Sequence, residues 1–296
     1  MRVSTTSIYL TTSRGLGAAL GRVQEVSEKL SSGRQVNAWS DDTPAATSAT
    51  AYRAQEADWT SFARSVTDAK GWLDATDGTL QSMSSLLTRV RGLATSAVNG
   101  GLSSQARQAV GDEIEQLRTE LRDLGQTRHL GRSLFGGFGE HALATDGSGR
   151  VSYAGDDGAV RRQVSPTVVL PVNVGGRELF GFDDSGADVF ATLTELADVA
   201  RSGDTTAMSG LQHRLEGHAA AVRNGLSKVG ATYNQVDAAG QAGSVALQDI
   251  ASRRTELEDV DIAEAVLKLN AAQASYQAAL GAAAKANLPS LADFLR

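Results

Sequence analysis

Two stretches of this 296-residue chain, 45–165 and 172–288, contain no proline, and this feature constrains the fold more than any other. A proline inside a helix removes a backbone donor and clashes with the preceding turn. Both stretches are rich in Ala, Leu, Gln, Arg and Glu, which are residues that favour helix. The sequence therefore predicts long helices over most of the chain.

Apolar residues recur in both stretches at alternating spacings of four and three, which is the pattern of a coiled coil. From Phe62 to Ala97, ten of eleven such positions are apolar, and similar patterns cover 110–124 and 211–257. We expect these positions to form the core of a central helical rod. The expected core residues are Phe62, Val66, Leu73, Leu80, Met83, Leu87, Ile114, Leu117, Leu121, Val229, Tyr233, Val236, Leu247 and Ile250.

The middle of the chain has a different composition. Residues 131–190 contain 12 of the 31 glycines and two of the four prolines, together with short β-type runs such as 151–154 and 160–164. We therefore predict a mainly α fold: an elongated antiparallel helical bundle or coiled coil, built from the N- and C-terminal segments, with a small β-rich central insertion. Its expected parts are paired terminal helices (1–38 with 258–296), a central helical rod (39–130 with 187–257) and an outer insertion (131–186).

Each end of the chain has a helical pattern with one apolar stripe. A pair of such helices buries too little apolar surface to offset the loss of backbone entropy, so we expect these arms to order by packing on other copies. Residues 1–38 carry a net charge of +3 and residues 258–296 a net charge of −2, which favours their pairing. The expected assembly interface comprises Leu16, Leu20, Val23, Leu30, Ile262, Val266, Leu269, Tyr276, Leu280, Phe294 and Leu295.

The sequence contains no group of residues with the types and spacing of a catalytic or metal-binding site. We therefore predict no catalytic residue, no cofactor and no metal site. There is no cysteine, and two of the four histidines, His213 and His218, lie five residues apart on different sides of an expected helix. The acidic pairs at 41–42, 156–157 and 183–184 lack the spacing of an EF-hand loop and fit helix caps or turns.

Charge and hydropathy exclude further classes of partner. The net charge of −6 gives no general electrostatic reason to bind nucleic acid. No window approaches 18 apolar residues, so we expect no membrane insertion. The first thirty residues lack the apolar core of a cleavable signal peptide, and we expect any export to use another route.

Short motifs near both ends resemble the signatures of bacterial flagellins and their hook-associated relatives. Near the start these are LSSGRQVN (30–37) and SDDTPAA (40–46), and near the end DVDIAEA (259–265) and QASYQAAL (273–280). Two motifs in the right order at opposite ends are more specific than either alone. The signature residues are Ser31, Ser32, Gly33, Asn37, Asp41, Asp42, Asp261 and Gln277.

Within that family, the opening MRVST, the internal LFGG (134–137) and YAGDDG (153–158) and the closing SLADFLR resemble the hook-associated protein 3 branch. Gln35 and Trp39 depart from the expected signature. The resemblance implies a structural, non-enzymatic subunit at the hook–filament junction, which assembles with itself in a ring and links hook-associated protein 1 to flagellin. It also implies an extracellular place in the flagellum, export through the flagellar type III apparatus, and a flagellar export chaperone.

Three alternatives stay open. The first is a short or minor flagellin that forms the filament itself. The second is a free-standing coiled-coil adaptor, and the third is an enzyme or small-molecule binder. The number of copies along the filament separates the first alternative from a junction protein. Presence in sheared flagella or in the culture medium argues against the second, and only a convergent acid–base or metal constellation would favour the third.

Overall fold

The computed structural model describes residues 5–99, 101–182 and 187–286. The chain divides into two compact units, one formed by 1–58 with 246–296 and the other by 59–245. The described residues form seven α-helices and three two-stranded antiparallel β-hairpins. The prediction of a mainly helical chain with antiparallel helices and a small β-rich insertion is therefore confirmed.

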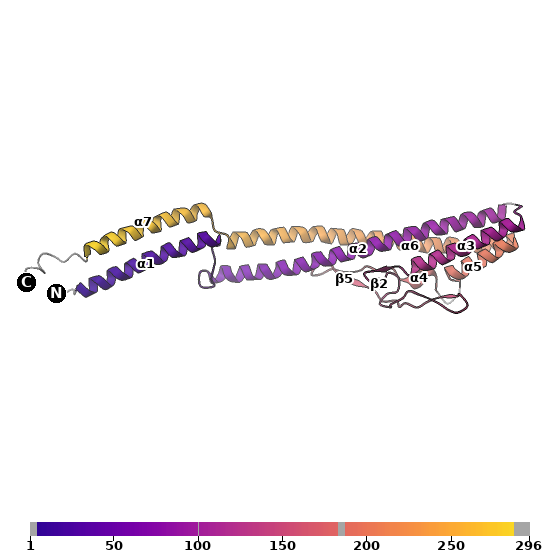
Figure 1. Ribbon diagram of the computed structural model, residues 1–296, viewed down its shortest axis with the longest axis horizontal. Coiled ribbons are helices and arrows are strands. Elements are labelled where there is room, and N and C mark those ends of the chain that lie inside the picture. Colours follow the sequence, from indigo (N-terminus) through magenta and orange to yellow (C-terminus); the bar gives the residue numbers. More distant parts are fainter. Residues whose placement is uncertain (1–4, 100, 183–186, 287–296) are drawn as a thin grey trace, which may run out of the picture. The chain divides into compact units, whose positions relative to one another are not determined.

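The terminal unit is built on α1 (Thr5–Ser32) and α7 (Ile262–Ala286), which pack along one another (Figure 1). It also contains the start of α2 (Thr43–Asn99) and the end of α6 (Thr205–Glu258). Local chemistry sets the helix ends. Gly33 follows α1 with φ +70°, a conformation that favours glycine. Asp42 accepts a hydrogen bond from the Ala45 amide at 2.9 Å and caps α2.

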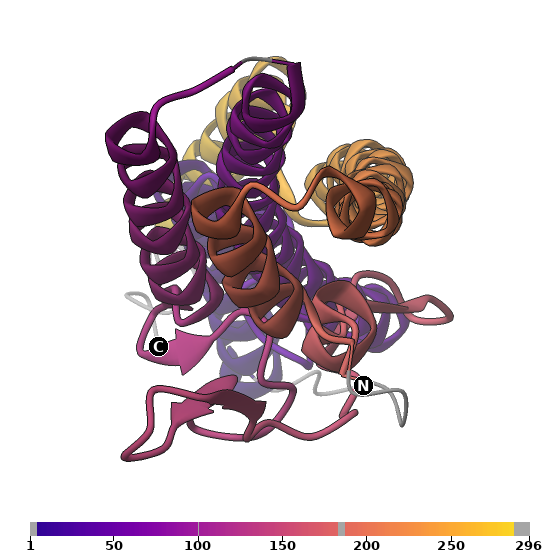
Figure 2. The same ribbon diagram turned by 90° about the vertical axis from the view of Figure 1, so that its right-hand side faces the viewer.

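The larger unit places α2 and α6 antiparallel. Lys70 and Asp237 form an ion pair at 2.6 Å, whereas Arg91, further along α2, pairs at 3.3 Å with Glu216, which lies earlier in α6. Figure 2 looks along the helices of this unit and shows α3 (Ser104–Gly125) and α5 (Val189–Ser202) side by side. Ser103 caps α3, since its side chain accepts from the Ala106 amide at 3.2 Å.

The residues expected to form the rod core lie mostly in the core of the larger unit. Phe62 and Tyr233 are half-buried there, while Leu247 and Ile250 lie in the terminal unit. Ile250 is buried and Leu247 is half-buried. The remaining ten are buried in one hydrophobic cluster: Val66, Leu73, Leu80, Met83, Leu87, Ile114, Leu117, Leu121, Val229 and Val236.

The first of the three hairpins begins at Arg128, just before the predicted insertion (131–186). The insertion contains the other two hairpins and the short helix α4 (Gly176–Phe180). Its aromatic side chains form a small core, in which the Phe180 ring lies 5.8 Å from Phe135 and 5.7 Å from Phe190, centroid to centroid. This cluster attaches the hairpins to α5. The hairpins pair β1 (Arg128–His129) with β2 (Arg132–Ser133), β3 (Leu143–Thr145) with β4 (Val151–Tyr153), and β5 (Arg161–Gln163) with β6 (Val169–Pro171).

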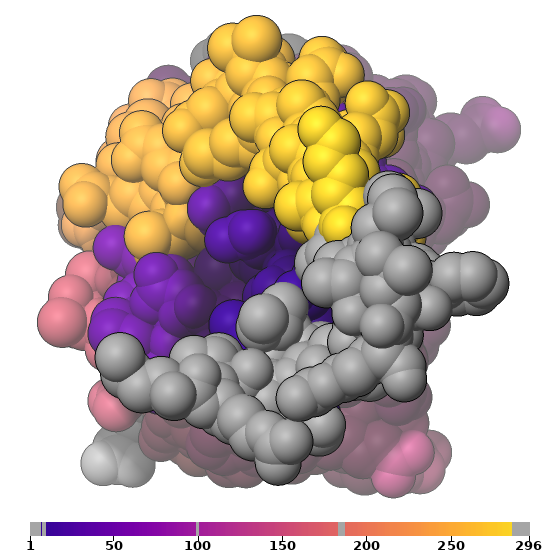
Figure 3. All heavy atoms as spheres, turned by 90° about the vertical axis from the view of Figure 1, so that its left-hand side faces the viewer, coloured from indigo at the N-terminus to yellow at the C-terminus, as the bar shows by residue number. Residues whose placement is uncertain are grey.

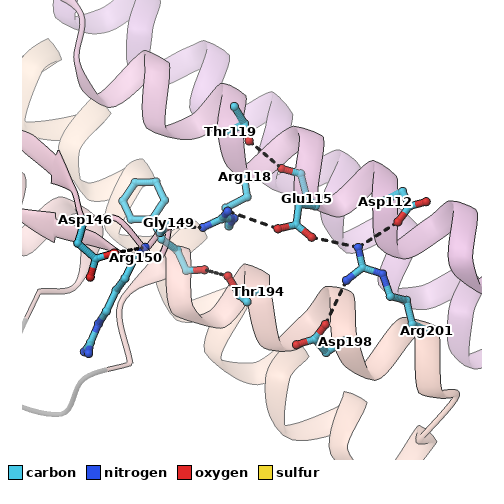
Figure 4. A network of polar contacts seen from close by, with 11 residues as sticks. Asp112, Glu115, Arg118, Thr119, Asp146, Gly149, Arg150, Thr194, Asp198 and Arg201 are labelled. Carbon is cyan, nitrogen blue, oxygen red and sulfur yellow. Dashed lines mark hydrogen bonds and ion pairs between the residues drawn. The ribbon is translucent and has the colours of Figure 1, made fainter.

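A network of ion pairs joins α3 to α5 (Figure 4). The Arg201 guanidinium donates to Asp112 and Glu115 on α3, both at 3.0 Å, and to Asp198 on its own helix at 3.1 Å. Hydrogen bonding to Glu115, and then to Asp112, raises the pKa of Arg201. Because the arginine is a quarter exposed, this network fixes the register of the two helices more than it adds stability.

Gly111 allows the close approach of α3 and α5. A Cβ at this position would lie 2.6 Å from Arg201 Cγ and 2.9 Å from the backbone oxygen of Ala197. Gly111→Ala should therefore separate the helices and lower the free energy of unfolding by about 1–3 kcal/mol, measured by urea unfolding. Gly78→Ala is the matched control, because Gly78 lies in α2 with open space around it. The control should raise stability by about 0.5–1 kcal/mol, and equal effects of the two changes would contradict the packing argument.

Candidate functional site

The pairing of α1 with α7 uses one side of each helix. Less exposed residues recur on both at alternating spacings of three and four, and Figure 3 shows α7 in yellow lying against α1 in indigo. Ala19 on α1 and Ala265 on α7 are the most buried residues of the two sets. The sets are Thr12, Leu16, Ala19, Val23, Val26 and Leu30 on α1, and Ala265, Leu269, Ala272, Tyr276, Ala279 and Ala283 on α7.

The predicted assembly residues fall into two groups. Five of them lie half-buried within the helix pair: Leu16, Val23, Leu30, Leu269 and Tyr276. Four others are exposed, with Leu20 at 40%, Ile262 at 65%, Val266 at 40% and Leu280 at 42%. Phe294 and Leu295 lie outside the described residues. The helix pair thus leaves apolar side chains uncovered. On α7, Ile262, Val266 and Leu280 follow one stripe at spacings of four and fourteen, and Leu267, 70% exposed, lies beside that stripe.

Leu20 lies at the edge of the α1–α7 pair, 40% exposed, rather than between the two helices. Small residues at positions 19 and 265 let the two helices approach closely, so the pair turns its alanines inward and leaves the neighbouring leucine at its edge. The large apolar residues of α1 do not by themselves indicate this arrangement. The available signal was Ala19, which lies three residues after Leu16 and four before Val23.

The two signature segments, more than 200 residues apart in the sequence, meet in the terminal unit. Arg34 and Asp259 form an isolated antiparallel β-bridge. The Gln35 amide donates to the Glu258 carbonyl at 2.7 Å, and the Val260 amide donates to the Gly33 carbonyl at 3.0 Å. Backbone hydrogen bonds therefore tie the end of α1 to the connection between α6 and α7.

The polar signature residues hold this connection in shape. The Ser32 hydroxyl donates to the Lys29 carbonyl and accepts from the Arg34 amide, both at 3.2 Å. Asp261 caps α7 by accepting from the amides of Ala263 at 2.9 Å and Glu264 at 3.1 Å. The caps at Asp42 and Asp261 begin the two helices that follow the joined segments.

Asp41 organises the loop before α2. Its carboxylate accepts hydrogen bonds from the Ala38 amide at 2.9 Å and the Asn37 amide at 3.0 Å. These bonds, that of Ala38 first, hold the pKa of Asp41 below its usual range. The signature residues Ser31 and Gln277 are exposed.

Charged side chains reinforce the joined segments. Arg53 on α2 pairs at 2.8 Å with Glu258, whose side chain is largely buried, and Arg254 on α6 pairs with Glu56 on α2. A cavity of about 130 Å³ lies beside Glu258, and Trp39 lines it with 61% of its surface exposed. These ion pairs join residues about 200 positions apart, so no local spacing in the sequence indicates them.

The described residues contain no cluster of three or more His, Asp or Glu side chains that could hold a metal ion. None of the described helices is long and apolar enough to span a bilayer. The chemistry that the terminal unit does show is structural: paired helices, uncovered apolar side chains and a hydrogen-bonded connection between the two ends of the chain.

Comparison with known proteins agrees with this geometry. The model of the bacterial flagellin N-terminal helical region matches residues 3–139, and that of the C-terminal helical region matches residues 213–295, together more than half of the chain. The chain belongs to the flagellin family. Both matched regions include the signature segments that the terminal unit joins, so the site is built from the parts of the sequence that define the family.

Several flagellar proteins resemble the chain over most of its length. A flagellin of Halalkalibacterium halodurans is 26% identical over 93% of this chain and 91% of its own length. Flagellar hook-associated protein 3 of Escherichia coli is 24% identical over 94% and 96%. The structure of a flagellar hook-associated protein from Vibrio parahaemolyticus has a TM-score of 0.69 at 19% identity and covers 74% of this chain and 100% of that one, which shows a shared fold.

Proposed function

We propose that this chain is a structural subunit at the junction between the flagellar hook and the filament. The observation that carries the proposal is the match to hook-associated protein 3 of Escherichia coli, which spans nearly the full length of both chains. The same chain has both terminal regions of the flagellin family. A subunit that packs against flagellin requires such regions. Its role is mechanical, and no catalytic group takes part.

The terminal unit supplies the contacts between copies in this proposal. Leu20 on α1 and the stripe of Ile262, Val266 and Leu280 on α7 leave apolar surface exposed. Covering such side chains favours association, by about 0.6–1.2 kcal/mol for each leucine or valine that is already three-fifths buried in the helix pair. We place residues 1–38 with 258–296 at the inner tube, 39–130 with 187–257 in the next shell, and 131–186 outside. Phe294 and Leu295 belong to the proposed interface.

The partners follow from this position. On the hook side the subunit meets hook-associated protein 1, on the distal side it meets flagellin, and around the axis it meets copies of itself. The proposed route to the flagellum is the flagellar type III apparatus, with an export chaperone in the cytoplasm.

A second candidate function is a short or minor flagellin. The flagellin of Halalkalibacterium halodurans favours it, because that protein also matches over nearly its whole length. A filament subunit lies along the whole shaft in very many copies, whereas a junction subunit forms a short segment at its base. Position in the flagellum therefore separates the two candidates.

The experiment locates the protein on intact flagella. An epitope tag is inserted between Gly147 and Ser148, in the exposed turn of the β3–β4 hairpin, and flagella are labelled with gold-conjugated antibody. We expect gold at the hook–filament junction alone, and deletion of the gene should leave cells with hooks that release flagellin into the medium. Gold along the filament would instead establish a minor flagellin, and no gold on any flagellum would contradict both.

A further inference from the structure

The tip of the β1–β2 hairpin is built in an unusual way. Its two turn residues, Leu130 and Gly131, both have positive φ, +49° and +79°, which is the pattern of a type I′ turn. Glycine, asparagine and aspartate adopt this conformation readily, but for a leucine it is strained. Leu130 is the only residue other than glycine with positive φ among the described residues.

In the monomer, burial of the Leu130 side chain does not offset this strain. Its side chain is 80% exposed, more than any other large apolar side chain in the described residues. The Arg128 guanidinium donates to the Gly131 carbonyl at 2.6 and 3.0 Å, which holds the tip in one conformation. A rigid tip thus presents an apolar side chain that contributes nothing to the fold. A strained, exposed residue of this kind points to a contact outside the monomer.

The same unit contains an apolar groove with room for such a tip. The groove has a volume of about 610 Å³ and lies between the β5–β6 hairpin and the helices α2 and α6. Val168 in its wall is 38% exposed, so the groove opens to the surface. Its apolar lining includes Trp59, Pro166, Val168, Leu170, Ala238 and Ala242.

A chain cannot fill its own groove with its own tip. The hairpin is anchored at Trp72, because the His129 ring lies 5.9 Å from the Trp72 ring, centroid to centroid. The groove is at Trp59, thirteen residues earlier on α2, which is about 20 Å along the helix. This distance does not prevent the tip of a second copy from reaching the groove.

We propose that Leu130 of one copy inserts into this groove of a neighbouring copy. The inference rests on the proposed function, because it requires several copies in one assembly. The leucine and the groove are different surfaces, so the contact repeats head to tail and suits a ring or a helical array rather than a closed dimer. One tip in one groove buries much less than the roughly 1,200 Å² of a stable isolated complex, so the contact forms only where other surfaces gather the copies.

The natural chain has no cysteine, which makes a crosslinking test clean. Flagella are prepared from cells that carry the double variant Leu130→Cys/Ala242→Cys and are treated with a short bis-maleimide. Each copy then has one cysteine in the tip and one in the groove, so a head-to-tail contact should give a ladder of dimers, trimers and larger species. The matched control is Leu130→Cys/Ser227→Cys, with the second cysteine on the exposed side of α6 and outside the groove.

Leu130→Asn gives an independent measurement. Asparagine suits the turn better than leucine, so the thermal midpoint of the purified monomer should stay the same or rise. Loss of the buried leucine should weaken each contact about ten-fold or more, seen as less of the protein in isolated flagella.

The outcomes are distinct. A ladder with Ala242→Cys and none with Ser227→Cys supports the contact. Equal products from both variants, no ladder from protein that is present in the flagella, or wild-type incorporation of Leu130→Asn would overturn it and leave the proposed function standing. Absence of the unmodified chain from flagella would overturn both.

Discussion

Leu80→Asp should destabilise the larger unit by about 3 kcal/mol or more. Leu80 is fully buried in α2, and its Cδ1 lies close to Gly225 on α6, so the new carboxylate would stand between two packed helices without a partner. Burying a charge in this way is among the few single changes with so large an effect. Urea unfolding followed by circular dichroism measures the loss.

The matched control for this change is Ser82→Asp, two residues along the same helix. Ser82 is exposed, so the same charge meets water there and should change stability by less than about 0.5 kcal/mol. If Leu80→Asp unfolds at the same urea concentration as the wild-type chain, the register of α2 in the core is wrong.

The sequence predicted the long helices well because their signals are local and repeated. The core of α2 follows one alternating pattern from Val66 to Leu87, so an error in register would have moved every apolar residue out of the core together. The caps at Asp42 and Ser103 were predictable for the same reason, since each depends on an amide only three residues away.

The close contacts between helices were less predictable. The approach of α3 to α5 depends on Gly111 meeting the Ala197 carbonyl, and the pairing of α1 with α7 depends on Ala19 and Ala265. Small residues of this kind look neutral in a hydrophobic pattern, because they matter through the space they leave and not through the surface they bury.

The candidate site was predicted in its residues but not in its geometry. The motifs around Gly33 and Asp261 were recognised as one family signature, yet only the structure shows that the segments which contain them are joined by backbone hydrogen bonds. Such bonds involve main-chain atoms that every residue has, so side-chain identity does not encode their partners. The family resemblance predicted that both segments are part of the family signature. The fold shows that they form one connection held by backbone hydrogen bonds.

The double variant Val266→Asp/Leu280→Asp should abolish incorporation into flagella and leave the monomer folded. Both side chains are about 40% exposed at the edge of the contact with α1, so the new charges can reach water in the isolated chain. In an assembly that covers this stripe, each copy would bury two unpaired carboxylates, which costs several kcal/mol for every contact. Immunoblots of isolated flagella and swimming assays measure the loss, and circular dichroism checks the fold.

The matched control is Ala274→Asp, since Ala274 is also exposed on α7 but lies outside the stripe formed by Ile262, Val266 and Leu280. The stripe recurs at spacings of four and fourteen, close to whole turns of an α-helix, so an assembly that covers one of its members covers the others. The control adds a charge to the same helix without placing it in that stripe, and it should assemble normally. Normal swimming by the double variant would remove α7 from the proposed interface, whereas equal loss in the control would show that α7 tolerates no added charge on either side.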